Sequence, residues 1–359
     1  MQFKPVPILE VIRETKDVIT ICFDPAETPE EFLHFIPGQH LTLKVFVNFK
    51  EYRRSYSICS AQHEKILKVT VKKVAKGLVS NHLVDHLKPG NKIEISKPEG
   101  HFNIHPSADK RLHYFFFAAG SGITPIFSMI QSLLENEPKS NIHLLYGSRN
   151  EENIIFHKKL ESLAIKFEGQ LHLHYTLSKI KSKGLSFLSK SNDTWAGWKG
   201  RIDESMINRF LENYPAKNLE PSYYICGPGD LIECTKNSLI KLNIDPKSIH
   251  AEYFTAPVHV EPVTPSSSIA EATLIVHLND KRHEFKMPGN KKILDFLLDA
   301  KLDPPYSCSS GACSTCMAKI IQGEVKMDLA LALEPEEIAD GYILTCQSRP
   351  VSSIVEIKY

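Results

Sequence analysis

The sequence predicts three domains in series: an antiparallel β-barrel, a doubly wound α/β domain and a small α+β domain. At 359 residues the chain is long enough for two or three domains. Apolar residues alternate with polar ones up to about residue 105, and from 113 they gather in continuous runs separated by helical patterns. A proline- and serine-rich stretch then precedes a cysteine-rich end. These shifts predict domains at 1–105, 106–255 and 271–359, with a linker at 256–270.

The first domain is predicted to be a barrel because its strands are short and amphipathic. Apolar residues occupy every second position in three segments: Leu41, Leu43, Val45 and Val47; Leu67, Val69 and Val71; Ile93 and Ile95. Two Pro-Gly pairs, at 37–38 and 89–90, provide tight turns. Short strands joined by such turns are typical of a small antiparallel barrel.

The second domain is predicted to alternate strands and helices. The run 113–119 is continuously apolar, as a strand covered on both faces should be, and a helical stretch to Leu134 follows it. Further strand-like runs at 142–146, 171–177, 222–226 and 249–254 alternate with helical patterns near 153–164, 204–213 and 230–242. This alternation favours a parallel doubly wound sheet. The segment 181–200 interrupts it as an insertion without an assigned role.

The third domain is organised around cysteines. Cys308, Cys313 and Cys316 stand at C-x4-C-x2-C, and Cys346 follows after a longer gap. This is the ligand spacing of a plant-type 2Fe–2S ferredoxin, so the four cysteines are the predicted metal ligands. Small residues between them let the backbone wrap around a cluster. The alternatives are zinc, which usually takes two short cysteine pairs, and disulfides, which need an oxidising compartment. A helix near 291–301 and flanking strands complete a domain of β-grasp size.

Composition narrows the classes of partner. The formal net charge of +1 gives no reason to expect nucleic acid or an anionic membrane surface. No apolar run approaches the roughly 20 residues that a membrane helix needs. The N-terminal residues lack the pattern of a signal peptide, so we expect a cytoplasmic protein. Residues 1–255 hold 33 Lys and Arg against 28 Asp and Glu, whereas residues 271–359 hold 10 against 13. Opposite charges of this size would steer docking between the two parts.

A second motif lies in the barrel. The segment Arg53–Ser57 reads Arg-Arg-Ser-Tyr-Ser after a strand pattern, and it resembles the flavin signature of the ferredoxin–NADP reductase superfamily. The resemblance implies that Arg54 binds the flavin pyrophosphate, that Tyr56 stacks on the isoalloxazine and that Ser57 lies beside its reactive nitrogen. It makes Ser55 a further expected cofactor contact. A planar guanidinium, a flat phenol and a hydroxyl suit those roles. A polar strand edge is the alternative interpretation of four residues.

Further matches follow in family order. Gly77, Leu78, Val79 and Ser80 open a helix, where backbone N–H groups can bind phosphate, and residues 98–102 resemble the turn that closes the flavin site. The second phosphate loop favours FAD over FMN. Lys72, at the end of a predicted strand, is a further expected cofactor contact.

The nicotinamide nucleotide is expected in the second domain. Gly120 and Gly122 lie where a strand turns into a helix, with Thr124 and Pro125 in its first turn, and such a loop can approach a pyrophosphate closely. The resemblance also places Cys226, Gly227 and Pro228 where nicotinamide meets flavin, and Phe254 near the flavin. Cys226, Phe254 and Ser57 are therefore the predicted catalytic set, although a buried structural thiol is the alternative for Cys226.

Two residues bear on nucleotide preference. Ser148 and Arg149 follow the strand 142–146, where an acidic residue would bind the ribose hydroxyl of NADH. A serine and an arginine favour the 2′-phosphate of NADPH. Glu151 and Glu152 follow closely, so NADH stays possible.

The order of modules implies a function. A flavin domain, a nucleotide domain and a C-terminal ferredoxin domain resemble the reductase components that serve phenylacetyl-CoA-type oxygenases. We therefore expect an enzyme that moves electrons from NADPH through FAD and a 2Fe–2S cluster to an oxygenase partner. The alternatives are a reductase for a Rieske-type oxygenase or for a hybrid-cluster protein, and a non-enzymatic redox carrier or sensor.

Overall fold

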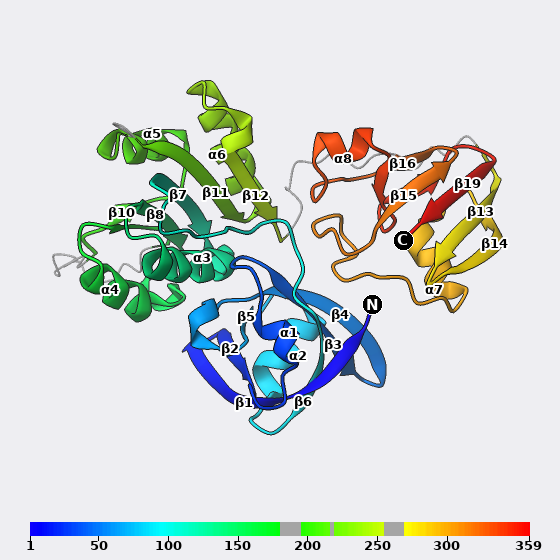
Figure 1. The fold of residues 1–359 in the computed structure, drawn as a ribbon, viewed down its shortest axis with the longest axis horizontal. Helices are drawn as coiled ribbons and strands as arrows, with labels where there is room; N and C mark the ends of the chain where they lie inside the picture. The colour runs from blue at the N-terminus through cyan, green and yellow to red at the C-terminus, as the bar shows by residue number, and fades with distance from the viewer. Residues whose placement is uncertain (180–194, 216–218, 255–268) are drawn as a thin grey trace, which may run out of the picture.

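A computed structural model describes residues 1–179, 195–215, 219–254 and 269–359. The chain forms three compact parts that surround a common junction (Figure 1), in the predicted order of barrel, α/β domain and α+β domain. Most of the predicted linker 256–270 and most of the segment 181–200 lie outside the described residues. None of the helices in the described residues is long and apolar enough to cross a membrane.

The barrel is a closed antiparallel sheet, as its alternating pattern predicts. Its order is β4-β3-β6-β1-β2-β5, and a bridge between Ile58 and Val69 joins the two ends. Helix α2 begins directly after Gly77, at the predicted phosphate loop, and its buried residues pack into the barrel core. The elements are β1 (Phe3–Thr15), β2 (Val18–Phe23), α1 (Glu30–Leu33), β3 (His40–Val47), β4 (Lys50–Ser57), β5 (Lys68–Lys72), α2 (Leu78–His86) and β6 (Lys92–Ser96).

The second domain is a parallel sheet of order β10-β9-β8-β7-β11-β12. Helices α3 and α4 pack on one face and α5 and α6 on the other, which gives the doubly wound arrangement. The elements are β7 (Leu112–Ala119), α3 (Ile123–Asn136), β8 (Asn141–Ser148), α4 (His157–Lys166), β9 (Leu171–Leu177), β10 (Trp198–Lys199), α5 (Glu204–Asn213), β11 (Glu220–Gly227), α6 (Gly229–Lys241) and β12 (Ile249–Tyr253).

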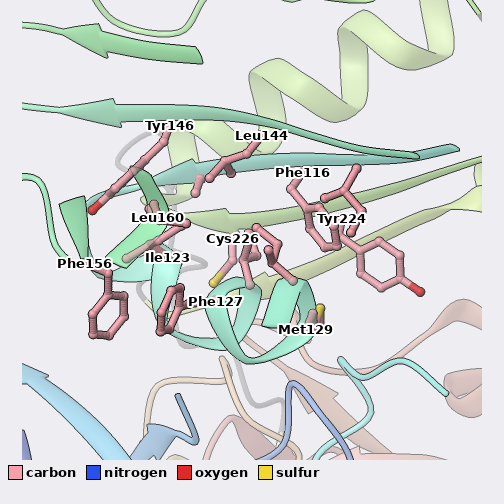
Figure 2. Packing of buried hydrophobic residues seen from close by; sticks show 14 of the residues in the cluster. Phe116, Ile123, Phe127, Met129, Leu144, Tyr146, Phe156, Leu160, Tyr224 and Cys226 are labelled. Carbon is pink, nitrogen blue, oxygen red and sulfur yellow. The ribbon is translucent and has the colours of Figure 1, made fainter. Parts of the chain in front are cut away.

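The core between the sheet and α3 positions the carboxyl end of the strands. Figure 2 shows Phe116 and Leu144 on the sheet facing Ile123 and Phe127 on α3, with Cys226 enclosed between the two layers. All of these side chains are almost fully buried. Helix α3 is thus held rigidly, and the loop that precedes it, Gly120–Gly122, is fixed at the edge where ligands bind in such folds.

The third domain packs a short helix against a mixed sheet of order β14-β13-β19-β15-β17. Strands β13 and β19 run parallel at its centre, and the other pairs are antiparallel. This is the predicted α+β domain. The elements are β13 (Glu271–Leu278), β14 (Lys281–Pro288), α7 (Ile293–Asp299), β15 (Met317–Gln322), β16 (Val325–Met327), α8 (Pro335–Ala339), β17 (Tyr342–Leu344), β18 (Ser348–Pro350) and β19 (Ile354–Lys358).

Candidate active site at the domain junction

The four predicted cluster ligands form two adjacent pairs. The Cys313 thiol donates a hydrogen bond to Cys308 Sγ at 3.0 Å, and Cys316 lies against Cys346 inside the domain, both almost fully buried. The loop between the pairs turns sharply because Gly311, at φ 77°, takes a left-handed conformation that suits glycine. The wrapped loop expected around a cluster is therefore present.

Each pair holds one thiol that ionises easily. A hydrogen bond from Cys313, helped by the Ser310 N–H, lowers the pKa of Cys308 to about 5, and a bond from Cys316 lowers the pKa of Cys346. The two donors, Cys313 and Cys316, have raised pKa values, because they give these hydrogen bonds and are buried. Thiolate is the form that binds metal. Nowhere in the described residues do three His, Cys, Asp or Glu side chains converge closely enough to hold one ion. Two pairs of thiols, each able to serve one iron, fit a two-iron cluster.

Strand β4 carries the predicted flavin motif and faces the junction. The Arg54 guanidinium donates to the backbone oxygen of Arg53 at 2.6 Å, and Tyr56 packs beside the barrel core. Burial raises the pKa of the Tyr56 phenol, so this ring stays neutral. Ser57 is almost fully buried, and its hydroxyl has no hydrogen-bond partner among the described residues. A buried hydroxyl without a partner fits the predicted contact with a bound flavin.

A buried group of titratable side chains stands behind Ser57. Strand pairing sets His40 opposite Ser57, and His40 Nδ1 lies 3.9 Å from Glu252 Oε1 on β12. Burial raises the pKa of Glu252 to about 8. The nearby Ser57 hydroxyl lowers this pKa slightly, although its geometry falls short of a good hydrogen bond. Burial, with a smaller effect of His101, lowers the pKa of His40 to about 4. At neutral pH both His40 and Glu252 are therefore largely uncharged, although their side chains lie within ion-pair distance of each other.

Two backbone loops meet at the carboxyl end of the α/β sheet. A Cβ on Gly122 would lie 2.0 Å from the backbone oxygen of Cys226, so only glycine allows this contact. Gly227, next to Cys226, packs on the backbone of Ala119 in the same way. Cys226 is fully buried, and burial raises its thiol pKa well above the usual value, followed by the effect of Glu252. The thiol is thus uncharged and fixed in position.

The other residues predicted in this region lie around the same edge. Thr124 is buried and donates its hydroxyl to the backbone oxygen of Ser121 at 2.9 Å, and Pro125 is buried beside it. Pro228 precedes α6, where it is the N-cap residue, and Phe254 is half-buried against the α3 side of the core.

Cations gather beside the glycine loop. Lys72, at the end of β5 in the barrel, reaches across so that its Nζ lies 3.0 Å from the Cβ position of Gly120. Burial lowers the pKa of Lys72, and the positive charge of Arg149 lowers it further. Arg149 is exposed, and Ser148 beside it is buried, with its hydroxyl donating to the Asn150 backbone oxygen at 3.3 Å. Within the described residues neither Lys72 nor Arg149 has a carboxylate partner in an ion pair, so both side chains could bind phosphate oxygens.

The predicted second phosphate loop opens helix α2. No side chain caps its first turn, which leaves the N–H groups of Leu78, Val79 and Ser80 to other acceptors. The Ser80 hydroxyl accepts from the Val74 N–H at 3.1 Å, so it stiffens the turn around Gly77. These backbone N–H groups are therefore available to bind a phosphate group.

Comparison with known proteins matches each part of the chain. Residues 5–104 match the oxidoreductase FAD-binding domain, residues 116–237 the oxidoreductase NAD-binding domain and residues 276–351 the 2Fe-2S iron-sulfur cluster binding domain. The chain is 32% identical to a component of the 1,2-phenylacetyl-CoA epoxidase of Escherichia coli (strain K12), across 99% of this chain and 98% of that protein. It is 33% identical to the ferredoxin reductase component of 3-ketosteroid-9-alpha-monooxygenase of Mycobacterium tuberculosis, across 98% of this chain and 94% of that protein.

The chain belongs to the family of oxygenase reductase components. As a member of this family it is an NAD(P)H-dependent oxidoreductase with FAD and a 2Fe–2S cluster as cofactors. The sequence-based predictions of family, fold class, enzyme class and cofactors are thereby confirmed.

Solved structures show the same fold. Phthalate dioxygenase reductase aligns with a TM-score of 0.60 at 24% identity, across 99% of this chain and 98% of that one. An intact type IV self-sufficient cytochrome P450 monooxygenase aligns with a TM-score of 0.69 at 21% identity, across 99% of this chain and 41% of that one. At these low identities the two similarities show only that the fold is shared.

Sequence reasoning assigned no role to His40 and Glu252, although both stand beside Ser57. His40 follows a Pro-Gly turn and looks like an ordinary strand residue. Its position opposite Ser57 depends on the register of the β3–β4 hairpin, and Glu252 comes from another domain. One signal was accessible in the sequence. Glu252 lies in the strand-like run 249–254, two positions before Phe254, and a carboxylate enclosed near a cofactor motif is costly and concentrates at functional sites.

Proposed function

We propose that this reductase takes electrons from NADPH and delivers them singly to an oxygenase that acts on phenylacetyl-CoA or a close relative. The observation that carries the client is the similarity to the Escherichia coli phenylacetyl-CoA epoxidase component, which extends over nearly the whole of both chains. The motif pattern around the flavin and cluster sites supports the same assignment.

Arg54, Tyr56 and Ser57 form the proposed flavin-binding face of β4. Arg54 would bind the pyrophosphate of FAD, and Tyr56 would cover one face of its ring. The start of α2 at Gly77–Ser80 would bind phosphate through backbone N–H groups, with Ser55 at the outer edge of the strand.

The glycine loop, Lys72 and Arg149 form the proposed nucleotide site. Gly120 and Gly122 let the loop approach a pyrophosphate, and buried Thr124 and Pro125 hold the first turn of α3 in place. Ser148 and Arg149 would bind the 2′-phosphate of NADPH, and Lys72 adds charge from the barrel. The arrangement favours NADPH over NADH because the 2′-phosphate gains the charge-assisted contacts.

When bound, NADPH would supply a hydride, FAD would convert the electron pair into single electrons, and the cluster would carry them singly. The chain's own residues position these groups and handle the proton. Cys226 and Phe254 would hold the nicotinamide and flavin rings in contact. Glu252, with a pKa of about 8, is mostly protonated at neutral pH and would keep a proton near the Ser57 hydroxyl. The Cys308–Cys313 and Cys316–Cys346 pairs would hold the cluster.

The test is reconstitution with defined clients. Purified protein and NADPH are mixed with a phenylacetyl-CoA oxygenase complex and its substrate, and the oxygenated CoA product is measured by mass spectrometry. A Rieske-type oxygenase serves as the alternative client. Relatives of similar identity are components of a 3-ketosteroid-9-alpha-monooxygenase and of a glycine betaine monooxygenase, so clients other than a phenylacetyl-CoA oxygenase occur among them. Product in the first mixture supports the proposal. Robust turnover in the second alone would assign the chain to the other class of client.

A further inference from the structure

The ferredoxin domain contacts the barrel through side chains next to the cysteine loop. Asp303 Oδ1 accepts a hydrogen bond from Arg53 Nη2 at 2.6 Å, and the Tyr306 ring stacks on the same guanidinium at 4.5 Å. Ser307 Oγ lies 2.7 Å from Ser55 Oγ, and Thr315 donates to Glu99 Oε1 at 3.3 Å. We call Asp303, Tyr306, Ser307 and Thr315 the docking face.

The docking face surrounds the accessible edge of the cysteine loop. Ser307 precedes Cys308, and Thr315 lies between Cys313 and Cys316. Cys308 also packs against the core of the α/β domain, which covers the loop from a second side. The opposite edge is closed, because Cys316 and Cys346 are buried inside the ferredoxin domain with Leu294 and Leu344. An electron acceptor could therefore approach the cysteine loop closely at the docking face once the barrel has left it. Figure 1 shows the ferredoxin domain beside the barrel and the α/β domain at the junction.

We propose that the docking face is shared: it binds the barrel while the cluster is reduced and then binds the acceptor protein in place of the barrel. This inference rests on the proposed electron-transfer function. The acceptor presents a cation where Arg53 now stands, paired with Asp303 and stacked on Tyr306. Arginine fits better than lysine, because one planar guanidinium can stack on the phenol and donate to the carboxylate at once.

The contacts suit reversible docking. The Asp303 side chain is 63% exposed even though its partner Arg53 is 5% exposed, so water and salt weaken the pair. The Ser307 and Thr315 contacts are single polar bonds at the edge of the loop. Such an interface gives orientation and fast exchange more than affinity. The opposite net charges of the two parts of the chain add long-range steering.

The experiment uses holoprotein and three variants. Asp303→Arg places two cations against each other, and the double variant Arg53→Glu with Asp303→Arg restores attraction inside the chain with the charges exchanged. Asp303→Asn keeps shape and removes the charge at an exposed position. Glu324→Gln is the matched control, because it removes an exposed acid of the same domain outside the docking face. The acceptor is mitochondrial cytochrome c, a lysine-rich one-electron protein, and NADPH reduces two of them with release of one proton.

Small-angle X-ray scattering measures docking, and stopped-flow absorbance measures cluster reduction and cytochrome c reduction. Asp303→Arg should increase the maximum dimension and slow both reactions at least about tenfold, because it replaces an attractive pair with two cations that repel each other. The exchanged double variant should recover the compact shape and cluster reduction. It should still reduce cytochrome c about tenfold more slowly, since a basic acceptor now meets arginine. Asp303→Asn should also reduce cytochrome c more slowly than the wild type, but by a smaller factor than Asp303→Arg. Glu324→Gln should match the wild type.

Recovery of cytochrome c reduction in the double variant, together with cluster reduction, would show that the acceptor uses another surface. Unchanged cytochrome c kinetics in Asp303→Asn would contradict the proposal equally. If wild-type protein passes no electrons from NADPH to cytochrome c, the proposed function fails instead, and the scattering results still decide whether Asp303 controls docking.

Discussion

Replacing His143 with phenylalanine should stabilise the α/β domain, and most strongly in acid. His143 lies on β8 between Phe115 and His172, with ring centroids 5.0 and 4.9 Å away. It is 2% exposed, and neither ring nitrogen has a hydrogen-bond partner among the described residues. An unsatisfied buried polar group costs about 1–3 kcal/mol, and a phenylalanine ring of similar shape removes that cost. We expect a gain of this size at neutral pH.

The acid effect follows from the pKa of His143. Burial, followed by the effects of the neighbouring His172, His113 and His174, lowers this pKa from 6.5 to about 3. A histidine whose folded pKa is depressed adds no protonation cost above pH 6.5, but the fold loses stability as the pH falls from 6.5 toward 3, because the unfolded state then binds the proton. The loss is about 1.4 kcal/mol per pH unit, so His143 alone should remove about 2 kcal/mol between pH 6.5 and 5. The ring of Tyr214, the residue that follows α5, lies 4.2 Å from the His143 ring centroid and also packs on this group.

Tryptophan fluorescence during urea unfolding gives the assay. The chain has two tryptophans, Trp195 and Trp198, and both belong to the α/β domain, so the signal reports this domain alone. Unfolding free energies are compared at pH 7 and 5 for the wild type, His143→Phe and His34→Gln, which removes an exposed histidine of the barrel. The gap between His143→Phe and wild type should widen by about 2 kcal/mol in acid. An equal acid loss in both proteins, or a less stable variant at both pH values, would refute the reasoning.

Three further predictions concern the cofactor sites. Cys313→Ser should lose the iron–sulfur absorbance and keep flavin, so ferricyanide reduction persists while cytochrome c reduction collapses; equal loss of both activities would show that the domains do not act in series. Wild-type kcat/KM should be higher for NADPH than for NADH, and Arg149→Ala should lose about 1.5–3 kcal/mol of NADPH binding while sparing NADH, with a higher wild-type value for NADH contradicting the assignment. Gly122→Ala places a Cβ 2.0 Å from the Cys226 backbone oxygen, so NADPH titration should show at least about tenfold weaker binding, while retained flavin absorbance serves as the control; unchanged NADPH affinity would mean that the loop relaxes freely.

Sequence alone was sufficient for the features that repeat along the chain or depend on local spacing. Alternation of apolar residues, as at Leu41–Val47, distinguishes barrel strands from the continuous run at 113–119, because the number of buried faces sets the pattern. The spacing of Cys308, Cys313 and Cys316 is local too, since one short loop must bring its thiols together. Fold class and the iron–sulfur cluster followed from such local signals, whereas FAD and the enzyme class followed from the resemblance of short motifs to a known family.

Tertiary structure alone decided which side chains meet across domains. Arg53 reads in sequence as one more strand arginine beside the flavin motif, yet it bridges to Asp303, 250 residues further along the chain. His40 and Glu252 likewise meet only because a barrel hairpin and the last strand of the α/β sheet converge at the junction. Such contacts depend on how whole domains pack, and a sequence pattern carries no record of that, because alternation and spacing encode which face of an element is buried but not against which partner.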